Sequence, residues 1–282
     1  MKSTAFELLQ PADIGSALQS LENSALYAKV LGGGQSLGPM LNLRLAQPDV
    51  LVSLAKVPEM RMAVLDETSL LLGAGVTHAL IEDGLVPDVT KGLMPYVAAN
   101  IAYRAIRNRG TLGGSLAHAD PAADWVNTMM LLGASIQITG RVQEAGASDY
   151  SLSQRTVDAQ NFMQGPFTTA LADHEILTAV RIRKLSASAR WGYYKFCRKT
   201  GEFAEAIGGV LSDPERGIYR LLIGATDGVP LVINDAQALI NSPNHAAIAS
   251  ILRDAGMGED PYAFKMHHTA LSRAIAMHNQ TT

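Results

Sequence analysis

Apolar and polar residues along the chain follow two spacings, one typical of short helices and one typical of β-strands. Near the N-terminus, apolar residues recur at helical spacing over 12–21, and Asp13 stands where the N-cap of that helix is expected. Short apolar runs at Tyr27–Leu31 and Val50–Leu54 predict two strands. We therefore expect residues 1–56 to form a small α/β unit.

The rest of the chain mixes the two spacings, which is typical of an α+β protein. The expected strands are Leu70–Thr77, Ser135–Thr139, Ile176–Ile182, Trp191–Arg198, Ala204–Leu211 and Tyr219–Ala225. The expected helices are Thr77–Gly84, Met94–Ile106, Asp124–Leu132, 234–241, 244–255 and 261–278. The polar stretch 140–156 predicts a loop or the tip of a hairpin.

Composition and charge exclude several classes of protein. The net charge is −3 and the Lys and Arg residues are scattered, so no basic stripe indicates a nucleic-acid partner. The single cysteine, Cys197, excludes an internal disulfide and an iron–sulfur cluster bound by this chain alone. The N-terminus lacks the apolar core of a signal peptide, and stretches such as Thr128–Ile138 are too short to span a bilayer. We expect a cytoplasmic protein.

Two glycine clusters carry the strongest chemical signal in the chain. Gly32–Ser36 follows a predicted strand, and Thr111–Ser115 lies about eighty residues later. Glycine lets the backbone adopt positive φ and approach a ligand closely. Backbone N–H groups in such loops point into one concavity that favours phosphate oxygens. The two clusters together are therefore candidates to hold the two phosphates of one dinucleotide.

Two other interpretations of the glycine clusters compete with this one. A Rossmann fingerprint fits poorly, because Leu37 stands where the third glycine belongs and Gly38 comes one residue late. No acidic residue ends the strand predicted at Val50–Leu54, as that fingerprint also requires. Each cluster alone is also compatible with a simple tight turn, and spacing does not separate that alternative from a phosphate site.

The residues that flank the glycines resemble a known family. The matching segments are Ala28–Leu37 with Leu41–Pro48, Ile106–Ser115 with Ala117–Asp124, Arg198–Ala204, and Tyr262 with Leu271–Ala274. These segments resemble, in order, the FAD loops and closing helix of the molybdenum hydroxylase flavoproteins. That family includes the medium subunit of aerobic carbon monoxide dehydrogenase and the FAD domain of xanthine dehydrogenase. The chain departs from the family at Tyr103–Ala105, where His-Pro-Gln is usual, and at Ser115, where Asn is common.

The resemblance implies a fold and a set of cofactor contacts. The implied fold is the bi-lobed FAD-binding fold of the vanillyl-alcohol oxidase type, with FAD-binding subdomains at 1–56 and 57–175 and a C-terminal α+β subdomain at 176–282. The implied FAD contacts are Lys29, Leu31, Gly32, Gly33, Gly34, Gln35, Ser36, Leu37, Ile101, Ala102, Thr111, Gly113, Gly114, Ser115 and Asp124.

Within that set, the resemblance assigns different parts of FAD to different residues. The two glycine loops hold the pyrophosphate, Ile101 and Ala102 lie near the isoalloxazine ring, and Asp124 bonds the ribityl chain. The segment around Lys199 approaches the ring, where a cation stabilises the reduced anion and raises the flavin potential. We therefore treat Lys199 as a candidate flavin-tuning residue.

The resemblance also implies a function in a larger assembly. This chain would be the FAD-binding, electron-transfer subunit of a molybdenum-containing dehydrogenase. A small partner would hold [2Fe–2S] clusters and a large partner the molybdenum cofactor, in a dimer of heterotrimers. Electrons would leave the FAD for an external acceptor. The alternatives are a self-contained FAD oxidoreductase of the peptidoglycan-reductase type and a nucleotide-binding assembly module. The sequence leaves the substrate and the final acceptor open.

Other polar residues have ordinary structural explanations. His267 and His268 are adjacent, so on a helix they face different sides and suit one metal ion poorly. We expect them to be solvent-exposed, and we expect no metal site in the chain. His118 is expected to contact the flavin non-covalently or to pack, and Asp120 is expected to cap a helix.

Overall fold

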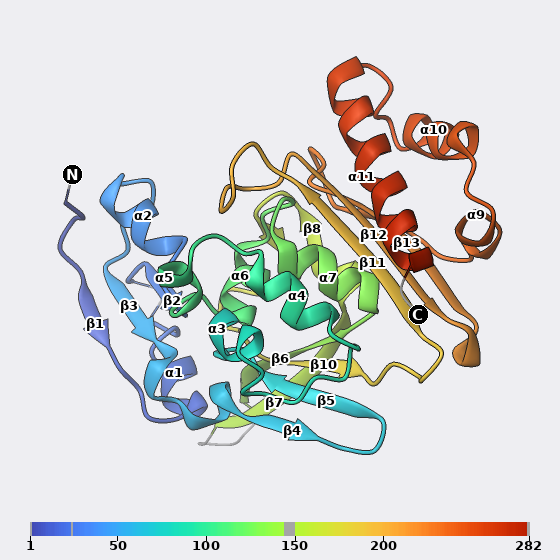
Figure 1. Cartoon of the computed structure of the whole chain (residues 1–282). Helices are drawn as coiled ribbons and strands as arrows, with labels where there is room; N and C mark the ends of the chain where they lie inside the picture. Colours follow the sequence, from blue (N-terminus) through green and yellow to red (C-terminus); the bar gives the residue numbers. More distant parts are fainter. Residues whose placement is uncertain (1, 24, 144–149, 281–282) are drawn as a thin grey trace.

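The computed structural model describes every residue except 1, 24, 144–149 and 281–282. Three main sheets follow one another along the chain; in Figure 1 the first is blue, the strands of the second run from cyan to yellow, and the third is orange. The first is parallel and has the order β1-β3-β2, with β1 at Glu7–Leu9, β2 at Ala28–Leu31 and β3 at Val50–Ser53. Helix α1 (Ile14–Gln19) precedes β2, and Asp13 caps it by accepting the N–H of Ser16 at 2.8 Å.

The second sheet is antiparallel and has the order β4-β5-β10-β6-β7. Its strands are β4 (Ala63–Leu65), β5 (Ser69–Gly73), β6 (Ser135–Gln143), β7 (Tyr150–Asp158) and β10 (Ile176–Arg183). The connecting elements are α2 (Leu37–Asn42), η1 (Leu54–Lys56), η2 (Pro58–Arg61), α3 (His78–Glu82), α4 (Leu93–Ala99), α5 (Arg104–Arg107), α6 (Leu112–His118), α7 (Asp124–Leu132), α8 (Ala159–Phe162), β8 (Met163–Gly165) and β9 (Thr168–Thr169).

The third sheet, also antiparallel, runs β11-β12-β13-β14 and is covered by the C-terminal helices, drawn in red in Figure 1. Its elements are β11 (Arg190–Phe196), β12 (Ala206–Asp213), η3 (Pro214–Arg216), β13 (Ile218–Gly224), β14 (Leu231–Ile233), α9 (Gln237–Asn241), α10 (His245–Asp254) and α11 (Pro261–Gln280). Gly192 and Gly208 let α11 lie close to this sheet, because a Cβ on either residue would overlap the helix backbone.

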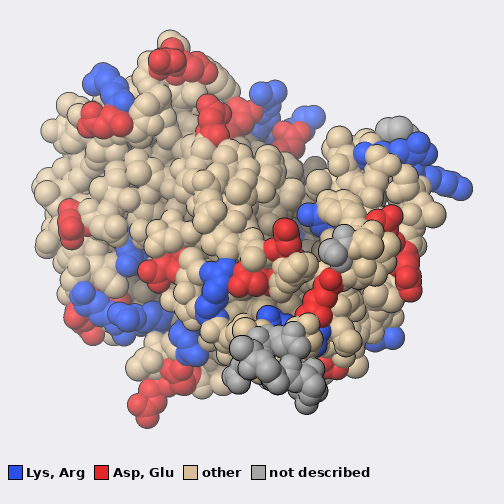
Figure 2. Space-filling model, turned by 180° about the vertical axis from the view of Figure 1, so that it is seen from behind, with Lys and Arg blue, Asp and Glu red and all other residues tan. Residues whose placement is uncertain are grey.

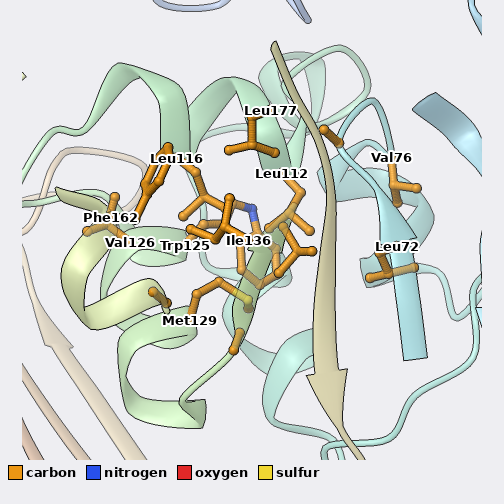
Figure 3. Close-up of a cluster of buried hydrophobic side chains, with 14 of the residues drawn as sticks. Leu72, Val76, Leu112, Leu116, Trp125, Val126, Met129, Ile136, Phe162 and Leu177 are labelled. Carbon is orange, nitrogen blue, oxygen red and sulfur yellow. The ribbon is translucent and has the colours of Figure 1, made fainter. Parts of the chain in front are cut away.

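Helix α7 lies at the centre of the molecule, and every one of its residues is buried. It contacts α4, α6, β10, β12 and β13, so it joins the second and third sheets. Trp125 and Met129 of this helix pack with Leu112, Leu116 and Ile136 in the core shown in Figure 3. The apolar run that predicts this helix therefore reflects burial on all sides.

Three expectations about elements differ from the structure. The stretch 140–156 belongs to a hairpin, as one of its two predicted alternatives has it, but most of it is strand, because β6 continues to Gln143 and β7 begins at Tyr150. Strand β7 lies at the edge of its sheet and most of its side chains face solvent, so its polar composition resembles that of a loop. The expected tip at 144–149 lies outside the described residues.

The helix expected over Met94–Ile106 is also interrupted. It ends at Ala99, and a turn with Ala102 at φ +44° separates it from α5. The second glycine cluster, in turn, forms the first turn of α6 instead of an open loop.

The subdomain bounds 1–56, 57–175 and 176–282 stay a prediction, and the pairing of one strand bears on the second boundary. Strand β10 pairs with both β5 and β6, so it occupies the middle of the second sheet. A boundary drawn by sheets therefore falls after Arg183 and not after residue 175. Acidic and basic side chains are interspersed over the face that Figure 2 shows, as the scattered charges in the sequence predict. Among the helices of the described part, none is long and apolar enough to cross a membrane.

Candidate functional site

The two glycine loops touch each other although about eighty residues separate them. A Cβ on Gly33 would overlap the carbonyl oxygen of Arg109 and lie 2.8 Å from the Cα of Gly110. A Cβ on Gly32 would lie 3.1 Å from Oγ1 of Thr111. Any larger residue at Gly33 would push the two backbones apart, so glycine is required for this approach.

The first loop offers several unpaired backbone donors. Within the described chain, the N–H groups of Gly33, Gly34, Gln35 and Ser36 donate to no protein acceptor. Gly34 has φ +73°, a conformation that side chains rarely adopt, and the Gln35 amide donates to the carbonyl of Gly33 at 3.1 Å. A turn with free N–H groups beside a helix start is a suitable site for an anion.

Hydrogen bonds to the segment that follows β5 hold the second loop in place. The N–H groups of Leu112 and Gly113 donate to the carbonyls of Val76 and Ala74 at 2.9 and 2.8 Å. Gly113 is buried against Ala74, and Gly114 is exposed on the side of the first loop. Oγ1 of Thr111 accepts the N–H of Gly114 at 3.1 Å and so caps α6. The rigid end of β5 therefore positions this loop.

A buried ion pair lies beside the turn that contains Ile101 and Ala102. Nζ of Lys195 donates to Asp124 at 2.7 Å and to the carbonyl of Asn100 at 3.2 Å. The hydroxyl of Tyr193 donates to the other oxygen of Asp124 at 3.1 Å. Side chains of Lys195 and Asp124 are 9% and 5% exposed.

The environment shifts the titration of this cluster. Burial raises the pKa of Asp124, while the charge of Lys195 and its hydrogen bond oppose that shift. Burial raises the pKa of Tyr193 further above its ordinary value, and the carboxylate of Asp124 adds to the effect. Tyr193 is therefore a neutral hydrogen-bond donor to Asp124.

The turn at Ile101 and Ala102 is tied down by Arg107. One guanidinium nitrogen, Nη1, donates to the carbonyls of both residues at 3.0 Å. The Nε and Nη2 atoms bind the carboxylate of Glu82 at 2.7 and 2.8 Å. Both residues of the turn are half-buried.

The other expected FAD contacts lie at the edges of this region. Lys29 is exposed on β2, with Nζ 5.4 Å from the centre of the Tyr27 ring. Leu31 and Leu37 pack on the small cluster formed by Leu41, Ala46 and Leu51. Ser36 begins α2, and Ser115 is half-buried in α6. The glycine loops and Asp124 are thus the best-organised members of the predicted set.

The sequence interpretation missed Lys195 and Tyr193. Lys199, the cation singled out from the sequence, lies exposed in the turn after β11, whereas Lys195 is the one that reaches Asp124. The signal was present in the strand pattern, because Trp191, Tyr193 and Lys195 share one face of the predicted strand. A lysine on an otherwise aromatic, inward face indicates a paired charge.

Three histidines make packing contacts or hydrogen bonds within the fold. His267 is buried, so the expected solvent exposure is wrong for this residue: its ring bonds the carbonyls of Ala263 and Gly224 at 2.9 and 3.2 Å. His268 stacks on His245 with ring centres 5.2 Å apart. His118 lies 5.2 Å from the Phe167 ring, and burial lowers its pKa. No cluster of potential metal ligands occurs among the residues with described positions.

Asp120 closes a turn and does not cap α7 itself. Its carboxylate accepts the N–H of Ala122 at 2.8 Å, whereas the N-cap position belongs to Ala123. Pro121 and Ala122 therefore lead into the helix through an Asx-type turn.

Comparison with known proteins places this arrangement in a family. Residues 4–184 match the family described as the FAD binding domain in molybdopterin dehydrogenase. The nicotine 6-hydroxylase medium subunit of Paenarthrobacter nicotinovorans is 34% identical over 279 residues, which cover 96% of this chain and 92% of that subunit. The carbon monoxide dehydrogenase medium chain of Afipia carboxidovorans is 33% identical over 289 residues, with 96% of each chain covered.

Solved structures support the same assignment. The reconstituted carbon monoxide dehydrogenase from Oligotropha carboxidovorans matches with a TM-score of 0.84 at 25% identity, covering 100% of both chains. Quinoline 2-oxidoreductase from Pseudomonas putida 86 matches with a TM-score of 0.81 at 28% identity, covering 99% of both chains. These matches confirm the α+β FAD-binding fold. The chain belongs to the FAD-binding family of the molybdopterin dehydrogenases and is an oxidoreductase flavoprotein of the molybdenum hydroxylase type.

Proposed function

We propose that this chain is the electron-transfer subunit of a molybdenum-containing dehydrogenase, with one FAD bound where the two glycine loops meet. The observation that carries the proposal is the contact between Gly32–Gly33 and Thr111–Gly114, beside unpaired N–H groups of the first loop. A pyrophosphate carries two phosphate groups and needs hydrogen-bond donors on both sides. Two loops that are remote in the sequence meet here beside free backbone amides, so together they can supply such donors.

The phosphate end of the site depends on backbone donors. A doubly charged pyrophosphate loses its hydration shell on binding, and pre-aligned N–H groups compensate for that loss. In our proposal the amides of Gly33–Ser36 and the start of α6 perform this role. Lys29 and the hydroxyls of Ser36 and Ser115 lie at the edges and supplement it, and the Thr111 hydroxyl orients Gly114.

The ring end of the site lies at the turn and the ion pair. We place the flavin ring beside Ile101 and Ala102, and the ribityl chain at Asp124, whose carboxylate Lys195 and Tyr193 hold in position. Lys199 remains a candidate tuning residue on the exposed turn after β11. When bound, FAD accepts electrons singly and releases them in pairs, which suits a link between iron–sulfur clusters and a two-electron acceptor.

The proposed partners follow from what the chain lacks and from its relatives. With Cys197 as its single cysteine, the chain has too few thiolates to hold an iron–sulfur cluster. Similar proteins are named as medium chains or subunits, among them the caffeine dehydrogenase subunit beta of Pseudomonas sp.. We propose a large partner with the molybdenum cofactor, a small partner with [2Fe–2S] clusters, a dimer of such heterotrimers, and a cytoplasmic location.

Titration of the purified chain with FAD tests the proposal. We expect a yellow complex without substrate turnover, and turnover only with both partners added. A chain that takes up no FAD would overturn both flavin hypotheses in favour of a non-redox assembly module. Substrate turnover by the chain alone would favour a self-contained oxidoreductase of the peptidoglycan-reductase type.

A matched pair of glycine variants locates the site. In Gly33→Ala the new Cβ overlaps the carbonyl of Arg109, so the loops separate and we expect FAD affinity to fall by about tenfold or more, equal to roughly 1.4 kcal/mol. Gly38→Ala meets open space and is the control. Equal FAD affinity for Gly33→Ala and wild type, with far-ultraviolet circular dichroism confirming the fold, would place the cofactor elsewhere.

A further inference from the structure

The turn between α4 and α5 holds a residue in an unfavourable conformation. Ala102 has φ +44°, in the left-handed region that residues other than glycine, asparagine and aspartate seldom adopt. Residues held in such regions persist only when their surroundings restrain them, and they cluster at functional sites. The turn therefore requires a restraint, and Arg107 supplies one.

Arg107 connects this turn to α3. Its Nη1 atom donates to the carbonyls of Ile101 and Ala102 at 3.0 Å each, and its other nitrogens form a two-point contact with Glu82. The side chain is 12% exposed, so water screens these bonds weakly. The bond with Arg107 is the largest cause of a lowered pKa at Glu82, so the carboxylate stays charged.

Arg104, one turn earlier, provides a natural contrast. It binds the same Glu82 at 2.8 Å and also Asp83, but its side chain is 47% exposed. In the described part of the chain its hydrogen bonds go to these two carboxylates and not to the turn. An exposed arginine of this kind contributes little to stability.

Helix α3 also supports the second glycine loop. The N–H of His78, its first residue, donates to the carbonyl of Gly110 at 3.0 Å, and Thr77 forms a bridge with Thr111. The anchor of Arg107 thus belongs to the same element that positions the phosphate loop. The ring end and the phosphate end of the site share one support.

We propose that Arg107 is a positioning residue for the flavin. By binding the carbonyls of Ile101 and Ala102, it holds the turn in its left-handed conformation and sets the backbone surface beside the flavin ring. This inference rests on the proposed function, because that function places the ring at Ile101 and Ala102. Arg107 acts through the turn and does not itself touch the cofactor.

Spectra of FAD-loaded variants test the positioning. We expect Arg107→Met to shift the visible absorption and circular dichroism bands of the flavin, to change its reduction potential, and to weaken FAD binding by about tenfold. Arg107→Lys keeps one cation that reaches either the carbonyls or Glu82, so it should restore part of each signal. Arg104→Met is the control and should match wild type. An Arg107→Met variant with wild-type flavin spectra and potential would overturn the inference.

A second measurement needs no flavin. Glycine tolerates positive φ, so Ala102→Gly removes the backbone strain of the turn that Arg107 restrains. We expect Arg107→Met to lower the urea midpoint of the cofactor-free chain by less in the Ala102→Gly background than in wild type. Strictly additive effects would overturn the restraint. If wild type takes up no FAD, the proposed function fails, while this cycle still decides whether Arg107 restrains the turn.

Discussion

Buried charges at single positions shape this site more than its exposed charges do. Asp124 and Lys195 lose most of their contact with water, and each is acceptable there only because the other is present. Burial raises the pKa of Asp124, and the Lys195 ammonium and the Tyr193 hydroxyl oppose that shift by interacting with the carboxylate. The site can therefore present a carboxylate of defined orientation next to the turn at Ile101.

His78 makes the chain sensitive to acid. Its Nδ1 atom accepts the indole N–H of Trp125 at 2.9 Å, and burial lowers its pKa to about 4, with the Arg107 charge as the second cause. In the unfolded chain the imidazole binds a proton near pH 6.5. The unfolded state thus binds more protons between pH 6.5 and 4, and the stability contribution present above pH 6.5 is lost as the pH falls through this window.

The lowered pKa of His78 determines how much stability the chain loses in acid. A shift of this size corresponds to about 3 kcal/mol over the whole window. We expect His78→Gln, which keeps an acceptor for Trp125, to flatten the fall of unfolding free energy between pH 7 and pH 5. Urea unfolding at both pH values measures the difference. Equal slopes for the variant and wild type would contradict the role of His78 and leave His118 and His278, whose pKa values burial also lowers, as the next residues to test.

At the scale of elements, glycine determines how closely the parts of the site approach. Gly113 lies in α6 where its Cα faces Ala74 at the end of β5, and a Cβ there would lie 2.9 Å from the Cα of Ala74. The apolar spacing of the sequence predicts most strands and helices, but it does not report such contacts. The break at Ala102 was missed for the same reason, since Arg107, which restrains it, is itself anchored by Glu82 on α3, far away in the sequence.

We expect Gly113→Ala to destabilise the chain and to displace the second loop. Overpacking of this kind costs about 1–3 kcal/mol, because neither backbone yields easily. Ala74→Gly makes room for the added methyl group and should recover part of the loss in the double variant. Denaturant unfolding of the two single variants and the double variant measures the coupling. Additive losses would mean that the helix moves freely away from the strand.

At the scale of the whole molecule, the proposed site lies where the part of the chain that forms the first sheet meets the part that forms the second sheet. Besides the glycine loops, the ion pair between Glu22 and Arg141 at 2.8 Å links them. The family resemblance predicts both loops and their common ligand, because flanking residues carry that information. The alternation along β11 shows that Lys195 faces inward, but its pairing with Asp124 depends on how the second and third sheets pack. The sequence therefore identifies the two glycine loops better than the residues around the flavin ring.

A ligand that binds across two units stabilises both against unfolding. At a free FAD concentration about 100 times its Kd, the folded chain gains about 2.7 kcal/mol, which corresponds to a rise of roughly 5 °C in the unfolding midpoint. Thermal unfolding with and without FAD measures the rise, and Gly38→Ala should show it in full. Gly33→Ala should lose about half of it or more, because a tenfold weaker affinity lowers the gain to about 1.4 kcal/mol. An undiminished rise in Gly33→Ala would place the cofactor away from the contact between the two loops.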